Sequence, residues 1–592
     1  MSSPWPAPVP EPHTCGPDTS QPDGPASDGP ASNDPPPGLP ARVADKPQDA
    51  YDRPPDWAAP GAALVRSAAT DVVPTLAELG RVHIVGIAGA GMSGLARILL
   101  ARGVSVTGCE ARESDTVDAL RMLDARVWIG HRVDHLDGVD SVVYSTAIPP
   151  RHLELVAGRE RGVRVLRRAA ALAAALADRR ALTVAGTHGK TTTTSLLTVA
   201  LQAGGLDPSF AIGGTLHETG RNAHFGSGEY AVIEADESDG SFLLLRSEIA
   251  IVTNVEADHL ENHGDLAGVE RAFEQFVDRI VPGGLLVVCL DDAGSARLAG
   301  YARRVIADGR DLRVRTYGES PDADVVVTQI VEASASVTLT VRGLAHGAVD
   351  RERPLDGQRP LDGQRPVTDE RTVTDERTVT GGRTVTVGGL VGRHMALNAA
   401  SALAVAAELG VDLDKVAATW HAFRGIKRRF ELRGTADGVR VYDDYAHHPT
   451  EIAAELHAAR AVTGTGRLVA VFQPGTFSRT QTFAVEFAEA MALADVAVVM
   501  DVFPSREEPI PGVTGALVAD AIPLAPENVI YEPSWAATAS RVAGVVRAGD
   551  VVVTMGIGDV HLLCPDILAE ITRRAAERDA APDADTGREG SG

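Results

Sequence analysis

The sequence predicts an α/β protein with three domains built on parallel sheets. Its 592 residues exceed what one hydrophobic core normally supports. Short apolar runs alternate along the chain with segments whose apolar residues recur at helical spacing, which is the pattern of repeated strand and helix units. Several of the apolar runs end in glycine-rich or polar loops, and open parallel sheets bind their ligands at such strand ends.

Shifts in composition divide the chain. Residues 1–60 hold 17 of the 36 prolines, with nine Asp and Glu against three Lys and Arg, so we expect a disordered proline-rich extension over residues 1–75. This extension is interpreted as solvated, with a partner-binding role as the alternative. The three folded domains are expected at 76–178, 179–426 and 427–576, and a disordered tail at 577–592.

Charge and cysteine content exclude several classes of protein. The formal net charge of −24 argues against a nucleic-acid or anionic-membrane partner. Four scattered cysteines without a C-x-x-C pair argue against a zinc ribbon or a disulfide scaffold. No long uncharged apolar run and no secretory signal is found. We therefore expect a cytoplasmic protein that acts on small molecules.

The strongest motif lies at the start of the central domain. The apolar run from Leu182 to Ala185 predicts a buried strand, and apolar residues at helical spacing follow the glycine loop after it. In the pattern G-x-x-G-K-T, backbone N–H groups surround phosphates, Lys190 reaches the outer phosphates and the Thr191 hydroxyl ligates Mg²⁺. The alternative is a turn without a ligand. The predicted nucleotide-binding residues are Gly186, Thr187, His188, Gly189, Lys190, Thr191 and Thr192.

Polar clusters follow two further strands of the predicted central sheet. Glu234 follows the run from Tyr230 to Ile233, and His259 lies shortly after the run from Ile249 to Asn254. Because the carboxyl ends of parallel strands lie at one edge of the sheet, these side chains are expected to meet the phosphate loop. The alternative interpretation is a pair of solvated acidic loops.

A second glycine loop opens the first domain. The strand starting at Arg81 leads into Gly89, Gly91 and Gly94 in the pattern G-x-G-x-x-G, and Glu110 ends the next predicted strand, Val104 to Gly108. This spacing indicates a nucleotide diphosphate at a helix N-terminus with an acidic side chain on a ribose. Alternatively, the glycines only permit close packing. Later runs complete a doubly wound domain: Val127 to Ile129, Ser141 to Ser145 and Val163 to Leu166.

The rest of the chain carries weaker signals. A tandem hexapeptide repeat within residues 345–383 predicts a loop inserted in a hairpin of Val337–Val341 and Thr384–Val387. Asn398 lies on the small apolar face of a helix from His394 to Leu409, where a ligand contact competes with a core role. A basic segment that includes Arg429 precedes a third domain of alternating strands and helices.

Together these motifs resemble the Mur ligase family of peptidoglycan synthesis over roughly residues 78–575. The matching segments are Gly89–Gly94, Gly186–Thr192, Glu234–Asp239, Thr253–His259, Gly392–Asn398, Asp443–Thr450 and Phe472–Thr480. The sequence departs from the family pattern at Ala88, Glu110, Met395 and Gly475. The departure at Gly475 leaves amino-acid binding to Arg479.

The resemblance implies Rossmann-like first and last domains around a central P-loop ATPase. It implies ATP and Mg²⁺, the substrates UDP-N-acetylmuramate and L-alanine, an acyl phosphate intermediate, and a monomer or weak homodimer. The implied catalytic residues are Lys190, Glu234, His259, Asn398, Arg429 and Asp444, with Thr191, Glu234 and His259 on metal. The implied substrate-binding residues are Gly89, Gly91, Met92, Ser93, Glu110, Asn222, His448 and Arg479.

Three alternatives remain open at this point. A ligase that attaches a recycled murein tripeptide to the same sugar nucleotide would share most of these motifs. An NAD-dependent oxidoreductase would explain the first glycine loop but not the phosphate loop. A catalytically inactive, nucleotide-gated interaction protein would explain the long extension but not the retained Lys190, Thr191, Glu234 and His259.

Overall fold

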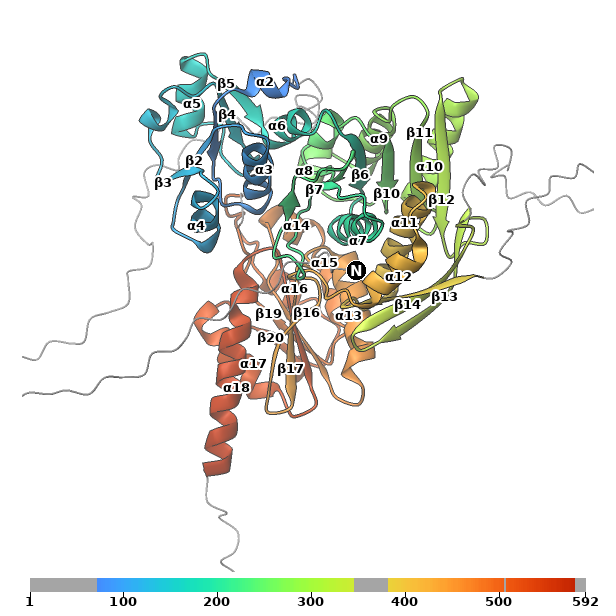
Figure 1. Cartoon of the computed structure of the whole chain (residues 1–592). Coiled ribbons are helices and arrows are strands. Elements are labelled where there is room, and N and C mark those ends of the chain that lie inside the picture. The colour runs from blue at the N-terminus through green and yellow to red at the C-terminus, as the bar shows by residue number, and fades with distance from the viewer. Residues whose placement is uncertain (1–71, 345–381, 505–506, 581–592) are drawn as a thin grey trace, which may run out of the picture. The chain divides into compact units, whose positions relative to one another are not determined.

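The computed structural model describes residues 72–344, 382–504 and 507–580 (Figure 1). Within these residues the strands form three sheets of five, ten and six strands. This confirms the predicted three-domain α/β class. None of the described helices is long and apolar enough to span a membrane. The hexapeptide repeat and nearly all of the predicted extension lie outside the described residues.

The first domain is a parallel sheet with strand order β3-β2-β1-β4-β5. Its strands are β1 (Val82–Val85), β2 (Val106–Glu110), β3 (Arg126–Ile129), β4 (Ser141–Tyr144) and β5 (Arg164–Arg167). Its helices are α2 (Leu76–Leu79), α3 (Ala90–Ala101), α4 (Asp115–Arg121), η2 (Val133–Leu136), α5 (Leu153–Glu160) and α6 (Arg168–Ala175). Every β1 residue is buried, as expected for a central parallel strand covered on both faces. The strand order reverses between β1 and β4, which places the first glycine loop at the switch point.

One predicted strand is shifted. The run from Val104 to Gly108 was expected to be extended, but β2 starts at Val106 and includes Glu110. The reason is local, because the Val104 amide donates to the Leu99 carbonyl and closes the end of α3. Glu110 is therefore the last residue of the strand.

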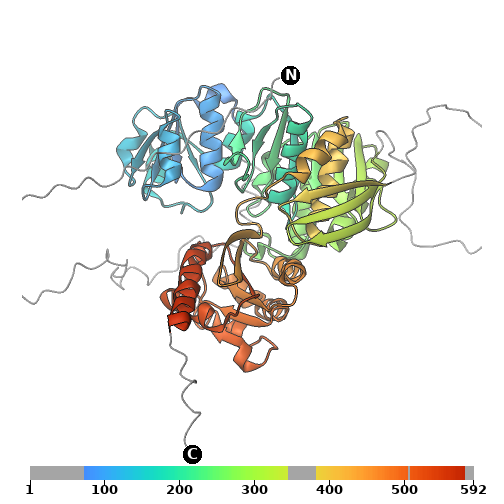
Figure 2. The ribbon, with the colours of Figure 1, turned by 60° about the horizontal axis from the view of Figure 1, so that its bottom comes forward.

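The central domain, coloured from green to yellow in Figure 2, is built on a sheet. Its strand order is β15-β14-β13-β12-β11-β10-β6-β9-β7-β8. Its first strands are β6 (Arg180–Ala185), β7 (Ser209–Ala211), β8 (Ala223–His224), β9 (Tyr230–Glu234) and β10 (Ile249–Val252). The remaining strands are β11 (Gly284–Cys289), β12 (Leu312–Gly318), β13 (Val325–Ala333), β14 (Ser336–Arg342) and β15 (Arg383–Gly388). The centre is parallel, whereas β8 and the β13-β14-β15 end pair antiparallel. The predicted hairpin around the repeat is confirmed as β14–β15.

Helices cover both faces of the central sheet. They are α7 (Lys190–Ala203), η3 (Ser241–Leu244), α8 (Leu260–His263), α9 (Leu266–Val277), α10 (Ala293–Ala307), α11 (Arg393–Glu408) and α12 (Leu413–His421). The two faces form separate apolar cores, and α7 and α11 pack together in one of them. This packing brings Asn398 of α11 to the N-terminus of α7.

The last domain has the strand order β16-β17-β21-β18-β19-β20, with β16 antiparallel and the other strands parallel. Its strands are β16 (Glu431–Ala436), β17 (Val439–Asp444), β18 (Leu468–Phe472), β19 (Val496–Val499), β20 (Val529–Tyr531) and β21 (Val551–Met555). Its helices are α13 (Pro449–Thr463), α14 (Phe477–Thr482), α15 (Ala484–Met491), α16 (Ala516–Ala519), η4 (Pro526–Asn528), α17 (Trp535–Val545), η5 (Asp559–Leu562) and α18 (Leu563–Ala580).

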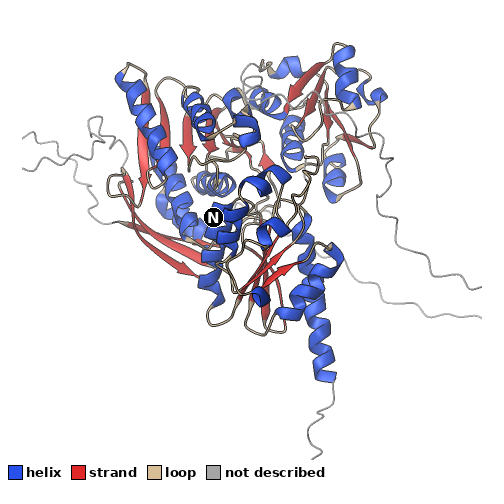
Figure 3. Cartoon of the chain, turned by 180° about the vertical axis from the view of Figure 1, so that it is seen from behind, coloured by secondary structure: helices blue, strands red, loops and turns tan. Residues whose placement is uncertain are grey.

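The C-terminal boundary needs a correction. Helix α18, labelled in Figure 1 and seen at the lower right of Figure 3, continues to Ala580, although a disordered tail was expected from residue 577. Two ion pairs stabilise its last turns. Arg573 pairs with Glu577 along the helix, and Arg578 pairs with Asp437 in the turn between β16 and β17.

Candidate functional site

The phosphate loop runs from the end of β6 to the start of α7. Gly186 and Gly189 have φ angles of +135° and +80°, in the range that residues with a Cβ rarely adopt. A Cβ on Gly186 would overlap Thr253 Oγ1, and one on Gly189 would lie 2.6 Å from Asn398 Oδ1. The loop is therefore packed closely against two neighbouring elements and needs glycine at both positions.

Lys190 is held inside the loop by three acceptors. Its Nζ donates to the carbonyls of Gly186 (2.7 Å) and Thr187 (3.1 Å) and to Glu237 Oε1 (2.8 Å). Burial opposes the charge, but Glu237 and Asp236 raise the pKa of Lys190. Glu237 is 2% exposed, and its other oxygen, Oε2, has no hydrogen-bond partner among the described residues. The loop thus holds a fixed ammonium group whose partner is a buried carboxylate.

The predicted magnesium ligands Thr191 and Glu234 are in contact. Thr191 Oγ1 donates to Glu234 Oε1 at 3.1 Å, and the Gly213 amide donates to Glu234 Oε2 at 2.7 Å. A hydroxyl and a carboxylate are the oxygen ligands that Mg²⁺ prefers. Because Gly213 orients the carboxylate, the residues present fit a magnesium ion between Thr191 and Glu234.

His259, the third predicted metal ligand, precedes α8 in a left-handed conformation with a φ of +51°. Its Nδ1 lies 3.3 Å from Glu261 Oε1 and its Nε2 lies 3.5 Å from Asp258 Oδ2. Burial opposes protonation, but Asp258 and Glu261 raise the pKa of His259. Metal binding requires the neutral imidazole, so protonation of His259 would compete with it.

Arg479, predicted to bind the amino-acid carboxylate, is engaged by the carboxylate of Asp258. Its Nη2 and Nε donate to Asp258 Oδ1 at 2.6 and 3.2 Å, and both side chains are buried. Although burial opposes ionisation, His259 and Arg479 hold the pKa of Asp258 far below its usual range. The last domain therefore presents a bidentate cation beside the His259 loop.

Two further predicted catalytic residues differ in what they contact. Arg429 Nη2 lies 3.4 Å from Thr191 Oγ1, so this cation reaches the phosphate loop. Asp444 instead accepts from the amides of Phe430 (2.7 Å) and Ala446 (2.6 Å). Burial and the nearby Glu455 raise the pKa of Asp444 well above its ordinary value. In this structure Asp444 orders the loop that carries Arg429.

His188 and His448 lie together beside the phosphate loop, with ring centroids 4.7 Å apart. His188 Nδ1 lies 3.1 Å from Glu451 Oε1, and its Nε2 lies 3.6 Å from Glu256 Oε2. Burial lowers the pKa of His188, but the two carboxylates outweigh burial and raise it to about 9. His448 Nε2 lies 3.3 Å from the Ala257 carbonyl.

The predicted substrate-binding residues around the first glycine loop make different kinds of contact. Glu110 accepts from the Ala88 amide at 3.0 Å, so its carboxylate closes the loop. Asn222 Nδ2 donates to the Ala90 carbonyl at 2.5 Å, which brings the central domain to the start of α3. Met92 and Ser93 have buried side chains, and Ser93 Oγ donates back to Ala90. These two side chains support the loop rather than project from it.

The glycines of that loop also differ. Gly89 and Gly91 have negative φ angles, and the left-handed residue is Gly86 at +69°, which the motif analysis did not single out. A Cβ on Gly91 would meet the flexible end of Arg168, whose Nη1 lies 2.6 Å away.

Sequence reasoning missed several charged partners in the site. The sequence analysis assigned no role to four acids that form ion pairs in the site. They are Glu237, which pairs with Lys190, Glu256 and Glu451, which pair with His188, and Asp258, which pairs with Arg479. All but Glu451 lie within the polar clusters noted after β9 and β10. No local signal says which acid faces which cation, because each pair joins distant parts of the chain.

Family comparisons agree with this geometry. The sequence pattern described as "Mur ligase family, catalytic domain" matches residues 81–180. The "Mur ligase middle domain" matches residues 184–361, and "Mur ligase, glutamate ligase domain" matches residues 428–558.

Individual proteins match over most of the chain. A UDP-N-acetylmuramate–L-alanine ligase from Saccharopolyspora erythraea is 51% identical over 88% of this chain and 99% of its own length. A ligase of the same name from Acidothermus cellulolyticus is 49% identical over 84% of this chain and 96% of its own length. The crystal structure of a UDP-N-acetylmuramate–alanine ligase from Thermotoga maritima has a TM-score of 0.62 at 25% identity, covering 84% of this chain and 99% of that one. A murein peptide ligase from Psychrobacter arcticus shares the fold, with a TM-score of 0.58 at 24% identity over 83% of this chain and 99% of that one.

Proposed function

The chain belongs to the Mur ligase family, and we propose that it joins L-alanine to the lactyl carboxylate of UDP-N-acetylmuramate at the expense of ATP. The observation that carries this proposal is the phosphate loop with its half-buried, paired Lys190, in a chain about half identical over most of its length to proteins named for this reaction. The reaction is a step in the synthesis of the peptidoglycan precursor. Intact charged groups around the loop favour catalysis over the inactive interpretation.

The chemistry requires activation of a carboxylate, because a free carboxylate has no leaving group. Transfer of the γ-phosphoryl group of ATP to the lactyl carboxylate gives an acyl phosphate and ADP. The neutral amine of L-alanine then attacks the acyl carbon, and a tetrahedral intermediate expels inorganic phosphate and forms the amide. Phosphoryl transfer of this kind depends on positioning and on neutralisation of charge.

The phosphate loop supplies the fixed charges for the first step. Lys190 would exchange its buried partner Glu237 for the β- and γ-phosphates, and the backbone from Gly186 to Gly189 would surround them. Arg429, 3.4 Å from Thr191, would add a second cation as charge moves to the leaving group. Asn398 would contact the nucleotide from α11.

Thr191 and Glu234 would hold a magnesium ion, and His259 would hold a second after it loses its proton. When bound, the metal would neutralise negative charge on the phosphates and so lower the repulsion that opposes attack. The hydrogen bond between Thr191 and Glu234 and the Gly213 amide behind it support the first of these sites.

Substrates would enter from the outer domains. Gly89, Gly91 and Glu110, with Asn222 from the central domain, would bind the sugar nucleotide at the N-terminus of α3. Arg479 would bind the carboxylate of L-alanine in competition with Asp258, and His448 would line the same side. Exclusion of water would protect the acyl phosphate from hydrolysis.

The decisive experiment is acceptor-dependent phosphate release by the full chain. ATP, Mg²⁺ and UDP-N-acetylmuramate are supplied, and L-alanine, L-serine, glycine or the murein tripeptide is added separately. We expect release that requires both the sugar nucleotide and L-alanine. Phosphate release with the tripeptide alone would establish the recycling ligase instead. No phosphate release with any acceptor, despite ATP binding, would establish a non-catalytic protein.

A further inference from the structure

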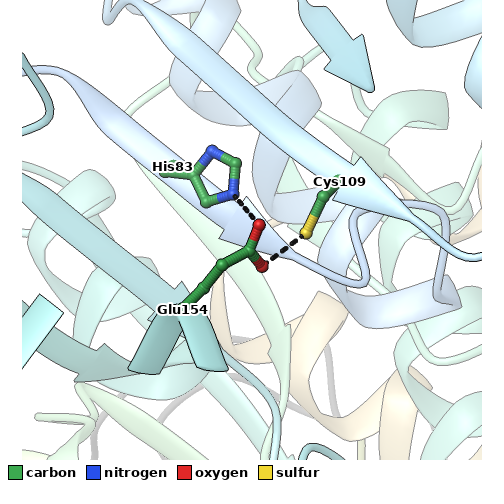
Figure 4. A group of neighbouring side chains, drawn as sticks. All are labelled: His83, Cys109 and Glu154. Atoms are coloured by element: carbon green, nitrogen blue, oxygen red, sulfur yellow. Dashed lines mark hydrogen bonds and ion pairs between the residues drawn. The ribbon is translucent and has the colours of Figure 1, made fainter. Parts of the chain in front are cut away.

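A cluster of metal-binding side chains lies in the first domain and takes no part in the proposed reaction. It is formed by His83 on β1, Cys109 on β2 and Glu154 on α5, whose side chains point toward one another (Figure 4). All three residues are 0% exposed. One ligand atom from each lies within 4.8 Å of the others.

The fold places these groups on one face of the sheet. Cys109 lies opposite Val85 in the parallel pairing of β1 and β2, and alternation along β1 turns His83 to the same face as Val85. This face packs into a small apolar core that includes Leu155 of α5. Polar groups in such a core are costly unless each one finds a partner.

Further histidines surround the same carboxylate. His131 Nδ1 lies 3.1 Å from Cys109 Sγ and 3.5 Å from Glu154 Oε2. His135 Nδ1 lies 2.9 Å from Glu154 Oε1, and His152 Nδ1 lies 3.8 Å from Glu154 Oε2. Cys109 Sγ donates to Glu154 Oε2 at 2.9 Å. Nitrogen, sulfur and oxygen donors therefore converge on one buried point.

One buried nitrogen in the cluster lacks a hydrogen-bond partner among the described residues. His83 Nδ1 lies 2.9 Å from Thr107 Oγ1, and the Thr107 hydroxyl donates to the Val82 carbonyl at 3.4 Å. The other ring nitrogen of His83 is Nε2. This Nε2 makes no hydrogen bond and lies 3.7 Å from Glu154 Oε1. A buried ring nitrogen that has no hydrogen-bond partner and lies near a carboxylate is a position where a metal ion could supply the missing partner.

We propose that this cluster binds one divalent transition-metal ion of the zinc class through His83 Nε2, Cys109 Sγ and Glu154, with His131 Nδ1 as the fourth ligand. Imidazole, thiolate and carboxylate are the ligands of such ions. A ligating histidine commonly donates its other N–H to a hydroxyl or carbonyl, and Thr107 Oγ1, 2.9 Å from His83 Nδ1, could accept such a bond when the metal is bound.

The spacing of the donors suits this ion. Zinc bonds of about 2.0–2.3 Å imply separations between tetrahedral ligands of roughly 3.3–3.8 Å. The Cys109, His131 and Glu154 atoms are 2.9, 3.1 and 3.5 Å apart, so a small expansion accommodates the ion. On binding, the Cys109 thiol loses its proton to solvent and the sulfur becomes a thiolate ligand.

The ion would have a structural role beneath the first glycine loop. The Cys109 carbonyl accepts from the amides of Gly86 (3.0 Å) and Ile87 (3.1 Å), at the start of that loop. A metal on the Cys109 side chain would tie β1, β2, the segment after β3 and α5 together. It would thereby fix the loop that we propose binds the sugar nucleotide.

The test is metal binding by the full chain after treatment with a chelator. We expect one equivalent of Co²⁺ to bind with a thiolate-to-cobalt charge-transfer band, and Zn²⁺ to displace it and raise the midpoint of thermal unfolding. Cys109→Ser should lose the band and the thermal shift. The matched control is Cys289→Ser, which alters another buried free cysteine in the central domain and should retain both.

A second variant covers the case in which Cys109→Ser does not fold. The His131 side chain is 28% exposed, so His131→Ala should be tolerated and should weaken Zn²⁺ binding at least tenfold. The proposal is overturned if the wild-type chain shows no thiolate band. It is also overturned if a folded Cys109→Ser or His131→Ala variant binds the metal as the wild type does.

Discussion

The two glycine loops of this chain share a backbone design and differ in charge. Each follows a buried parallel strand and opens a helix, α3 in the first domain and α7 in the central domain. From Gly86 to Gly94 the first loop contains no charged residue, and a carboxylate from β2, Glu110, takes one of its amides. In the second loop, Lys190 donates to Glu237 and Thr191 donates to Glu234.

The difference separates binding from chemistry. A glycine loop at a helix N-terminus offers N–H groups and a positive dipole end, which are sufficient to hold an anion. Phosphoryl transfer also needs fixed charges where negative charge builds up. The second loop has these charges, already paired, and the first does not.

The largest expected effect comes from removing the charge of the second loop. Lys190→Ala should lower kcat by about 10²–10³, because the loss of one transition-state charge commonly costs this much. Phosphate release at saturating substrates measures the effect. Lys415→Ala, on the exposed face of α12, is the matched control and should behave as the wild type. Near-normal turnover by Lys190→Ala would contradict the role of the second loop.

The next effect tests the backbone of the second loop. Gly189→Ala should weaken ATP binding at least tenfold, for two reasons. Residue 189 has a φ of +80°, which strains any residue with a side chain, and its Cβ would lie 2.6 Å from Asn398 Oδ1. Gly205→Ala has nearly the same φ, +77°, but its Cβ meets nothing within 4 Å, so it isolates the effect of backbone strain. Titration calorimetry with ATP compares the two variants. Equal affinities would show that the contact with Asn398 does not matter.

A smaller effect is expected in the first loop. Glu110→Ala removes the acceptor of the Ala88 amide. It should raise KM for UDP-N-acetylmuramate about tenfold and leave kcat unchanged, because a lost hydrogen bond to a charged group costs about this much free energy. Initial rates at varied sugar-nucleotide concentration measure both constants. Glu113→Ala, an exposed carboxylate nearby, is the control. A fall in kcat would mean that the first loop also serves the chemistry.

The last expected effect is on stability and concerns pH. Burial opposes protonation of His188, but Glu256 and Glu451 raise its pKa to about 9. The folded chain therefore keeps a proton that the unfolded chain releases above pH 6.5. The free energy of unfolding should therefore decrease as pH rises from 6.5 to 9, with this histidine contributing at most about 1.4 kcal/mol per pH unit. His188→Gln should flatten this slope in denaturant titrations, whereas His421→Gln, exposed on α12, should not. An unchanged slope in His188→Gln would exclude this histidine as the source.

Local patterns predicted the elements that carry the site. The strand, loop and helix around Lys190 and the hairpin that carries the repeat insertion occur where the sequence placed them. These features depend on apolar periodicity and on glycine and proline positions, which act over a few residues. The same local logic named Gly89 and Gly91, although Gly86 has the left-handed conformation.

Two features of the sheets were not evident from the sequence. The antiparallel pairing of β13 with β14 in the central sheet and the antiparallel edge strand β16 of the last sheet depend on which strands become neighbours, and apolar runs do not specify this. The start of β2 at Val106 likewise depends on how α3 ends.

The sequence by itself determined the α/β class, the family and the residue types around the phosphate loop, because these follow from spacing and side-chain chemistry along the chain. Only the tertiary structure decided the pairings. Arg479 meets Asp258 across 221 residues, Lys190 meets Glu237 across 47, and His83, Cys109 and Glu154 share one buried point. Such contacts depend on how strands order themselves and how helices pack over them, and no local pattern records which distant charge will be the neighbour.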